Sequence, residues 1–343
     1  MTNEQWNKLL AILAGEVFEP MPVGFIIDSP WLPGWAGMST LDYYCSEEKW
    51  LAANLKAVRE FPDVLFLTGF WSEFGMCTEP SAFGARCRWA RDELPFAEKI
   101  VKAIADLAGI EKPNPRTDGL LPFMIRRLEL QRSRIEEAGH SIRFAVSRGP
   151  LNIATFLMGT TEFLMAIRTD PEETRRFLTL ITDFIVDWLR YQKKCIPTIE
   201  GIFILDDIVG FLGEQDFRAA ALPYLKQIFG CLDVPVRFFH NDAQGLVTAK
   251  FLDEIGVNLF NFSFEHSMAQ MRERTGPNVT LLGNIPPRDV LAQGTPEDVA
   301  NSVRSVMGAI EDRSHILLSC GGGLPPNVPS ENLEAFLRTV RQP

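Results

Sequence analysis

The sequence contains no CxxC pair, no cluster of lysine and arginine, and no apolar run long enough to span a bilayer. Its six cysteines are scattered, which fits reduced thiols better than a disulfide framework. Acidic residues outnumber basic ones by 44 to 34, for a net charge of -10. That balance argues against nucleic acid or an anionic membrane as the main partner, because both require clustered positive charge. The N-terminus also lacks the pattern of a secretory signal. We therefore expect a cytoplasmic protein that acts on a small molecule or another protein.

Short apolar runs alternate with segments of helical period along the whole chain. The segments 46–61 and 170–194 begin with helix-capping residues and acidic first turns, which predicts helices. Nearly continuous apolar runs are typical of parallel strands covered on both faces. The expected strands are PVGFIID, DVLFLTGF, IRFAVSRG, GIFILDD, PVRFFHND, LFNFSF, VTLLGNI and HILLSCGG. We therefore predict an α/β fold, a (β/α)8 TIM barrel in a single domain 1–343, with an N-terminal helical extension at 1–20 and a helical insertion at 85–139.

Polar residues collect where the predicted strands end, which is the edge where TIM barrels carry their active sites. Those residues are Asp28, Trp71, Glu73, Asp206, Asp207, His240, Asp242, Ser263, Glu265, Asn284 and Cys320. Any single aspartate in this set is equally well explained as a cap for the following helix. His240 and Cys320 are not natural helix caps, so they are the stronger candidates for chemistry.

Three interpretations of His240 and Cys320 stay open from the residues alone. Imidazole and thiolate are ligands that zinc favours, and the carboxylate of Asp242 is close enough in sequence to complete a three-ligand site. A Cys–His nucleophile pair is the second interpretation. Core packing or capping, with no chemistry, is the third. The glycines at 321–323 would let the backbone pass close to a metal or substrate without a Cβ in the way.

Two C-terminal segments resemble the signature of the uroporphyrinogen decarboxylase superfamily, which includes a corrinoid-dependent, methylcobalamin-linked zinc methyltransferase branch. They are LLGNIPPRDVLAQGTPEDVANSV and LLSCGGGLPPNVPSENLEAF, and weaker similarity extends over almost the whole chain. The resemblance implies a TIM barrel, in agreement with the strand pattern.

The chain departs from genuine decarboxylases of this superfamily at four polar positions. The resemblance implies a histidine where Cys320 stands, an aspartate at Gly75 and a tyrosine at Phe156. It also implies an arginine-bearing loop near the N-terminus, where this chain has SPWLPGWAGMSTLDYY. Without a cation or carboxylate at these places, we do not expect the chain to bind a tetrapyrrole or decarboxylate it.

The methyltransferase branch is similar at the residues that would hold metal. The resemblance implies zinc on a His-x-Cys pair and a later cysteine, for which this chain has His240, Asp242 and Cys320. The segment TEPSAFGA is similar to another segment of the branch and brings Glu79 to the site. A carboxylate in place of a thiolate leaves zinc a stronger Lewis acid, suited to a methyl ether.

The resemblance therefore predicts transfer of a methyl group between a small donor, such as a methoxy-aromatic compound, and the cobalt of a partner corrinoid protein. The chain has no DxHxxG segment of its own for cobalamin, so the corrinoid would arrive on that partner. Asp206, Asp207 and Glu79 are the catalytic candidates. The substrate-binding candidates are Trp31, Trp71, Phe74, Phe156 and Asn284.

Two other functions are kept as alternatives. The barrel could be a small-molecule binding protein that retains the fold without the chemistry. It could also be a metal-free thiol enzyme, which requires a low thiol pKa at Cys320.

Overall fold

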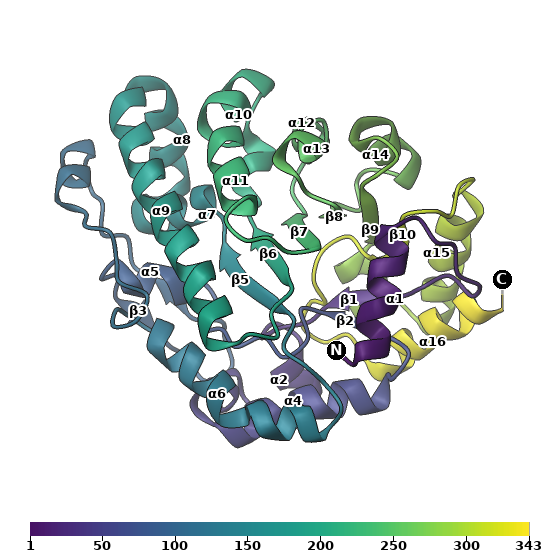
Figure 1. Ribbon diagram of the computed structural model, residues 1–343. Coiled ribbons are helices and arrows are strands. Elements are labelled where there is room, and N and C mark those ends of the chain that lie inside the picture. Colours follow the sequence, from purple (N-terminus) through teal and green to yellow (C-terminus); the bar gives the residue numbers. More distant parts are fainter. Residues whose placement is uncertain (343) are drawn as a thin grey trace.

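The computed structural model describes residues 1–342 and confirms the mixed α/β barrel (Figure 1). Its parallel strands are β1 (Gly24–Ile26), β2 (Leu65–Leu67), β5 (Phe144–Arg148), β6 (Gly201–Leu205), β7 (Val236–Asn241), β8 (Leu259–Phe262), β9 (Thr280–Ile285) and β10 (Ile316–Cys320). Six of them form one sheet in the order β10-β9-β8-β7-β6-β5, and β1 pairs with β2. Parallel bridges from Val23 to Leu318 and from Ile26 to Gly323 join the pair to β10.

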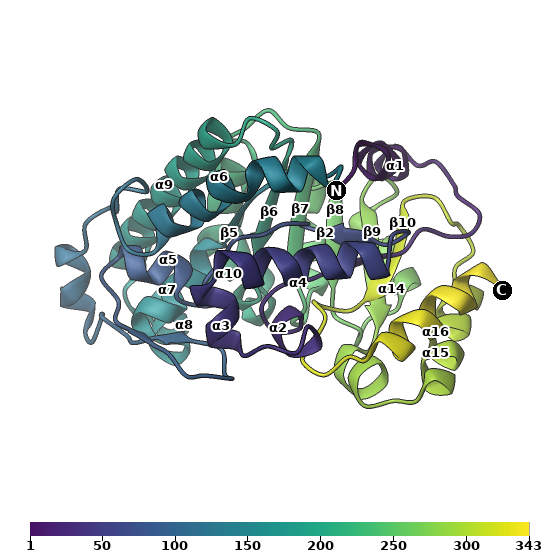
Figure 2. The same cartoon turned by 90° about the horizontal axis from the view of Figure 1, so that it is seen from below.

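Helices follow the strands and surround them (Figures 1 and 2). Those before β5 are α1 (Asn3–Leu13), α2 (Leu32–Trp35), α3 (Thr40–Cys45), α4 (Glu47–Glu60), α5 (Thr78–Ala82) and α6 (Leu121–Glu137). The segment between β5 and β7 contains α7 (Pro150–Met158), α8 (Thr160–Thr169), α9 (Pro171–Cys195), α10 (Glu214–Ala220) and α11 (Leu222–Phe229). The remainder are α12 (Leu246–Ala249), α13 (Leu252–Ile255), α14 (Met268–Thr275), α15 (Pro296–Gly308) and α16 (Ser330–Arg341). The helices predicted at 46–61 and 170–194 correspond to α4 and α9.

The predicted insertion at 85–139 is only partly helical. It contains a short antiparallel pair, β3 (Cys87–Arg88) with β4 (Phe96–Ala97), and a 3-10 turn at Ile104–Gly109. Its one long helix, α6, is the barrel helix that leads from β2 into β5, not an addition to the fold. Within residues 1–342 no single helix could span a membrane, and the one pair that passes by length and composition, α7 with α8, is bent by 109°.

Alternation along the strands divides the core into two layers. On β5, Phe144 and Val146 belong to an inner cluster, whereas Ala145 between them belongs to the outer one. Side chains of α1 complete the inner cluster, and the ring of Trp6 packs edge-on against Phe144 at 5.6 Å. Because Trp6, Leu9 and Ile12 are buried there, α1 fills the end of the barrel where the strands begin.

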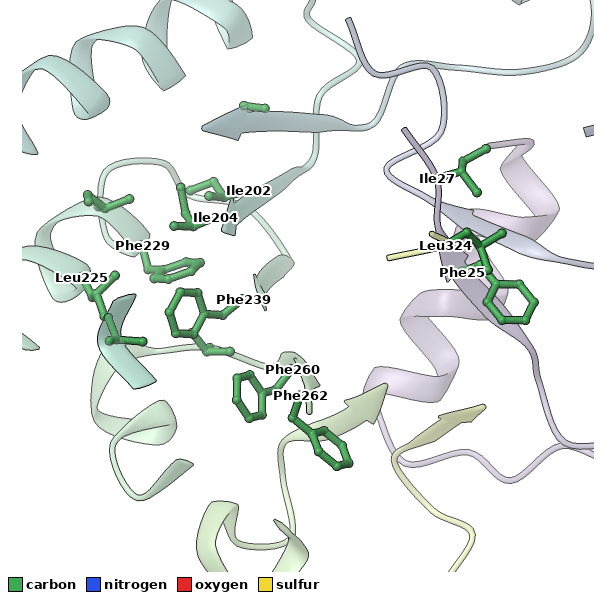
Figure 3. Packing of buried hydrophobic residues seen from close by; sticks show 14 of the residues in the cluster. Phe25, Ile27, Ile202, Ile204, Leu225, Phe229, Phe239, Phe260, Phe262 and Leu324 are labelled. Carbon is green, nitrogen blue, oxygen red and sulfur yellow. The ribbon is translucent and has the colours of Figure 1, made fainter. Parts of the chain in front are cut away.

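The outer layer packs the strands against the helices (Figure 3). Phe229 of α11 meets Phe239 of β7 edge-on at 5.8 Å, and Phe239 stacks on Phe260 of β8 at 6.1 Å. Each fully buried side chain of this kind stabilises the fold by roughly 1.5–3 kcal/mol. This apolar packing on both faces holds the strand ends, and the polar residues on them, in fixed positions.

Candidate functional site

The ends of β6 and β7 bring three potential metal ligands together. His240 lies opposite Leu205 in the parallel register, and Asp207 and Asp242 follow just beyond the two strands. Nε2 of His240 is 3.6 Å from Oδ1 of Asp207 and 3.9 Å from Oδ2 of Asp242. Their ligand atoms all lie within 4.8 Å of one another, and no other His, Cys, Asp or Glu trio in residues 1–342 does so.

The three side chains of the trio differ in their exposure to solvent. The side chain of His240 is only 8% exposed, whereas those of Asp207 and Asp242 are 34% and 45% exposed. The backbone N–H of Asp242 donates to Oδ1 of Asp207 over 3.1 Å, which ties the two loops together. Burial raises the pKa of Asp242, and the nearby Asp207 carboxylate adds to the effect while His240 opposes it. A cation between the carboxylates would relieve this repulsion.

A buried asparagine fixes the histidine ring. Nδ1 of His240 lies 2.7 Å from Oδ1 of Asn261, the inward-facing residue opposite it on β8. The amide nitrogen of Asn261 donates to the carbonyls of Leu282 and Cys320, over 2.9 and 3.1 Å. Because both amide hydrogens are used, Oδ1 must face the ring and accept from Nδ1–H. In the neutral ring, the lone pair of Nε2 is then directed toward the two aspartates.

The donor set fits a zinc ion. Imidazole nitrogen and carboxylate oxygen bind zinc at ~2.0–2.2 Å, which places tetrahedral ligand atoms ~3.3 Å apart. The present separations need only small side-chain shifts to reach that spacing. A histidine held by a hydrogen bond through its other nitrogen is the usual arrangement at such centres. Three protein ligands would leave a fourth position for a substrate.

Cys320 is close to the trio but is not part of it. It is fully buried at the end of β10, among residues of the outer layer, and its Sγ donates to the Gly322 carbonyl over 3.2 Å. Burial raises the pKa of its thiol to about 12. The glycine turn at 321–323 approaches the trio at Gly322, where an added Cβ would lie 3.0 Å from Oδ2 of Asp242.

Asp206 and Asp207 have different surroundings although they are adjacent. Asp206 is fully buried, and its Oδ2 accepts the Leu151 N–H over 2.8 Å at the first turn of α7. Burial raises the pKa of Asp206 to about 8. A Cβ on Gly149 would overlap this carboxyl group, so glycine is needed for the helix to approach it. Asp206 is thus placed as a helix cap, and Asp207 faces the barrel mouth.

Further buried carboxyl groups lie across the mouth. Glu79 on α5 accepts from the Ser147 hydroxyl and from the Arg148 N–H, over 3.2 and 2.9 Å, and burial raises its pKa. Glu73 accepts from the Gly75 N–H, and its Oε1 has no partner within residues 1–342. Burial together with the Glu73 charge raises the pKa of Asp28 to about 7.

The structure places the five predicted substrate-binding residues in different surroundings. Trp31 is fully buried, donates to the Val328 carbonyl over 2.9 Å and stacks on Trp35 at 4.5 Å, which is a core position. Trp71 lies beside Phe203 in the inner cluster, and the ring of Phe74 lies under the guanidinium of Arg127. Phe156 is half-buried on α7, and the amide of Asn284 donates to the His266 carbonyl.

The family model described as "Uroporphyrinogen decarboxylase (URO-D)" matches residues 5–343. The chain belongs to the uroporphyrinogen decarboxylase (URO-D) family. It is 24% identical to the uroporphyrinogen decarboxylase of Magnetococcus marinus over 77% of this chain and 75% of that protein. The enzyme of Cellvibrio japonicus is 25% identical over the same shares.

A solved structure of similar shape is described as a methyltransferase from Methanosarcina mazei. It has a TM-score of 0.81 at 16% identity and covers 98% of both chains. A B12-independent methionine synthase from Shewanella sp. W3-18-1 has a TM-score of 0.54 at 10% identity, covering 94% of this chain and 98% of that one. At these identities the two structures support the fold of the URO-D chain.

Sequence reasoning on this URO-D chain missed two residues at the mouth. Asn261 stands in the apolar run LFNFSF, and Arg148 ends the run IRFAVSR, each where strand alternation continues an inward column. A polar residue in such a column, inside an otherwise apolar strand, was the signal that could have identified both.

Proposed function

We propose that the protein is a zinc-dependent methyltransferase that moves a methyl group between a small donor and the cobalt of a partner corrinoid protein. The observation that carries the proposal is the trio of Asp207, His240 and Asp242 at the open end of the barrel. Membership of the URO-D family and the similarity in shape to a Methanosarcina methyltransferase support the same reaction class. Asp207 replaces Cys320 as the third ligand in this proposal.

The metal trio and Asn261 each have a task in the proposed reaction. His240, Asp207 and Asp242 would hold zinc, and Asn261 keeps the Nε2 lone pair of His240 directed at it. Bound there, zinc supplies a Lewis acid that polarises the bond between the methyl group and its heteroatom. As the methyl group is transferred to cobalt, the heteroatom keeps the bonding electron pair and takes up a proton.

The remaining candidates hold parts of the site or the donor in place and do not react with the methyl group. Asp206 caps α7 and so fixes the helix that carries Phe156, a half-buried ring outside both core clusters and free to contact a donor. Glu79 holds the end of β5 through Ser147 and the backbone of Arg148. Trp71 packs at the top of the inner cluster, where it would form the floor under a bound donor.

Metal content tests the ligand assignment directly. Elemental analysis of protein purified without chelator should give about one zinc per chain, lost in His240→Ala and Asp242→Ala. The matched control is Cys320→Ala. It should keep the metal, because the Cys320 thiol donates a hydrogen bond to the Gly322 carbonyl and lies outside the trio. Zinc retained in His240→Ala would refute the site.

Activity is tested with a corrinoid protein and a panel of methoxy-aromatic compounds, methylamines and thioethers. The absorbance change on cobalt methylation should appear with one class and disappear in His240→Ala. Uroporphyrinogen should not be decarboxylated. No cobalt methylation with any donor, in protein that holds zinc, would overturn the methyltransferase proposal and favour a binding protein.

A further inference from the structure

Arg148 is the only lysine or arginine among the last two residues of the barrel strands. It follows Phe144 and Val146 in the inward-facing column of β5. In the parallel register it lies opposite Leu205, which lies opposite His240. Neighbouring strands are ~4.8 Å apart, so Arg148 and His240 stand in the same layer with roughly 10 Å between their backbones.

The guanidinium of Arg148 has no fixed protein partner. It forms no ion pair within residues 1–342, and its side-chain nitrogens donate no hydrogen bond there. Its central carbon lies 5.8 Å from the ring centroid of Trp71, whose indole nitrogen is also buried without a partner. Five N–H donors are thus available at the mouth, above an aromatic ring.

The carboxyl groups near Arg148 do not cancel its charge. Burial raises the pKa of Asp28 to about 7 and raises that of Glu79, while the Arg148 charge opposes both shifts. Both acids therefore hold a larger share of protons than exposed acids would, and neither forms an ion pair with the guanidinium. Of the other carboxyl groups of the mouth, Asp207 and Asp242 face the opposite side at His240. Glu73, whose charge acts on Asp28, accepts from the Gly75 N–H and forms no ion pair with the guanidinium within residues 1–342.

We propose that Arg148 binds a carboxylate on the methyl donor, so that the substrate is a small acid with its methyl-bearing heteroatom at the far end. A guanidinium offers two parallel N–H donors that match a carboxylate, and a cation close to an aromatic ring favours a flat substrate. The roughly 10 Å between Arg148 and His240 suits one ring with a substituent at each end. The inference rests on the proposed function, because the far end is assigned to the metal trio.

Calorimetric titration of the zinc-loaded protein tests the subsite without any methyl transfer. The probes are 4-methoxybenzoate, its neutral counterpart 4-methoxybenzyl alcohol, and benzoate. We expect the two acids to bind the wild type, and Arg148→Met to weaken them roughly 10- to 100-fold without changing the affinity for the alcohol. Arg148→Lys should recover part of the loss, because it restores the charge but not the paired donors. Arg304→Gln, on the outer surface of α15, is the charge-matched control and should bind like the wild type.

Zinc content of Arg148→Met shows whether the mouth is intact in the variant. If its zinc is retained and its acid affinity equals that of the wild type, the proposal is wrong. Equal affinity of the wild type for the acid and the alcohol would also overturn it. Arg148-dependent binding of benzoate without cobalt methylation would keep the subsite and reject the methyltransferase. Cobalt methylation from neutral donors, with no binding of acids, would keep the methyltransferase and reject the Arg148 subsite.

Discussion

Oδ1 of Asn261 lies 2.7 Å from Nδ1 of His240, and the same asparagine donates to the backbone of two neighbouring strands. One side chain thus connects β7, β8, β9 and β10 at the level of the proposed metal. It fixes which nitrogen of the histidine carries the hydrogen, and so which nitrogen can bind a cation.

Replacement of Asn261 by alanine should weaken zinc binding by about 10- to 100-fold, because the ring loses its orientation and its hydrogen-bond acceptor. Competition against a chelator of known affinity measures the change. Asn258→Ala is the matched control, since Asn258 precedes the same strand at its other end and bonds to Arg237 and Pro235 there. Equal zinc affinities of the two variants would contradict the role of Asn261.

The thiol of Cys320 should be inert in the folded, metal-free protein. With its pKa raised to about 12 by burial, about one thiol in ten thousand is ionised at pH 8. Peptide mass spectrometry after iodoacetamide treatment should show alkylation of exposed Cys45 at least tenfold ahead of Cys320. In urea the two should react at similar rates. Fast alkylation of Cys320 in the folded state would restore the thiol-enzyme alternative.

Gly149→Ala should destabilise the protein by about 1–3 kcal/mol, because the new methyl group would overlap the buried Asp206 carboxyl and displace the cap of α7. Urea unfolding measures the change in the free energy of unfolding. The control is Gly308→Ala at the end of α15, where an added Cβ meets no atom within 4 Å. A loss no larger than that of the control would show that the cap is not rigid.

His140 should make the fold sensitive to mild acid. Burial lowers its pKa from 6.5 to about 4, so the unfolded chain binds a proton between these values that the folded protein does not. The free energy of unfolding therefore falls as pH drops from about 6.5 toward 4. His140→Phe keeps an aromatic ring against Phe70 and removes a buried, unpartnered nitrogen.

The phenyl ring introduced by His140→Phe cannot take up a proton. The free energy of unfolding of the variant, minus that of the wild type, should therefore be about 1–2 kcal/mol larger at pH 5 than at pH 8. Unfolding in urea at the two pH values gives the comparison, and pH 8 is the internal control. A difference between the proteins that does not change with pH would contradict the assignment.

The fold was predictable because strand alternation and helix caps are local signals. The apolar runs and the residues that precede two helices, Ser46 and Asp170, mark strands and helices that the structure contains within a few residues. The insertion was less predictable. Whether α6 belongs to it or to the barrel depends on which strands it joins, and periodicity does not carry that information.

The sequence could predict at which end of the strands the candidate residues lie, but not which of their side chains contact one another. Sequence placed His240, Asp242 and Cys320 at the same end of the strands, but alternation decides which face each side chain occupies. Cys320 falls one residue beyond inward-facing Ser319 and packs outward, while Asp207 turns in toward His240. Partnerships across strands, such as Asn261 with His240, depend on the register, which no short motif reveals.

Helix α1 closes the barrel at the end where the strands begin, through Trp6, Leu9 and Ile12. In the proposed reaction, donor and corrinoid protein must then share one entrance. A corrinoid protein seated over the mouth would block the exit of the small molecule beneath it. Turnover would follow a compulsory order, with the small donor bound before the partner and its demethylated product released after the partner leaves. Excess corrinoid protein would accordingly inhibit the reaction at low donor concentration.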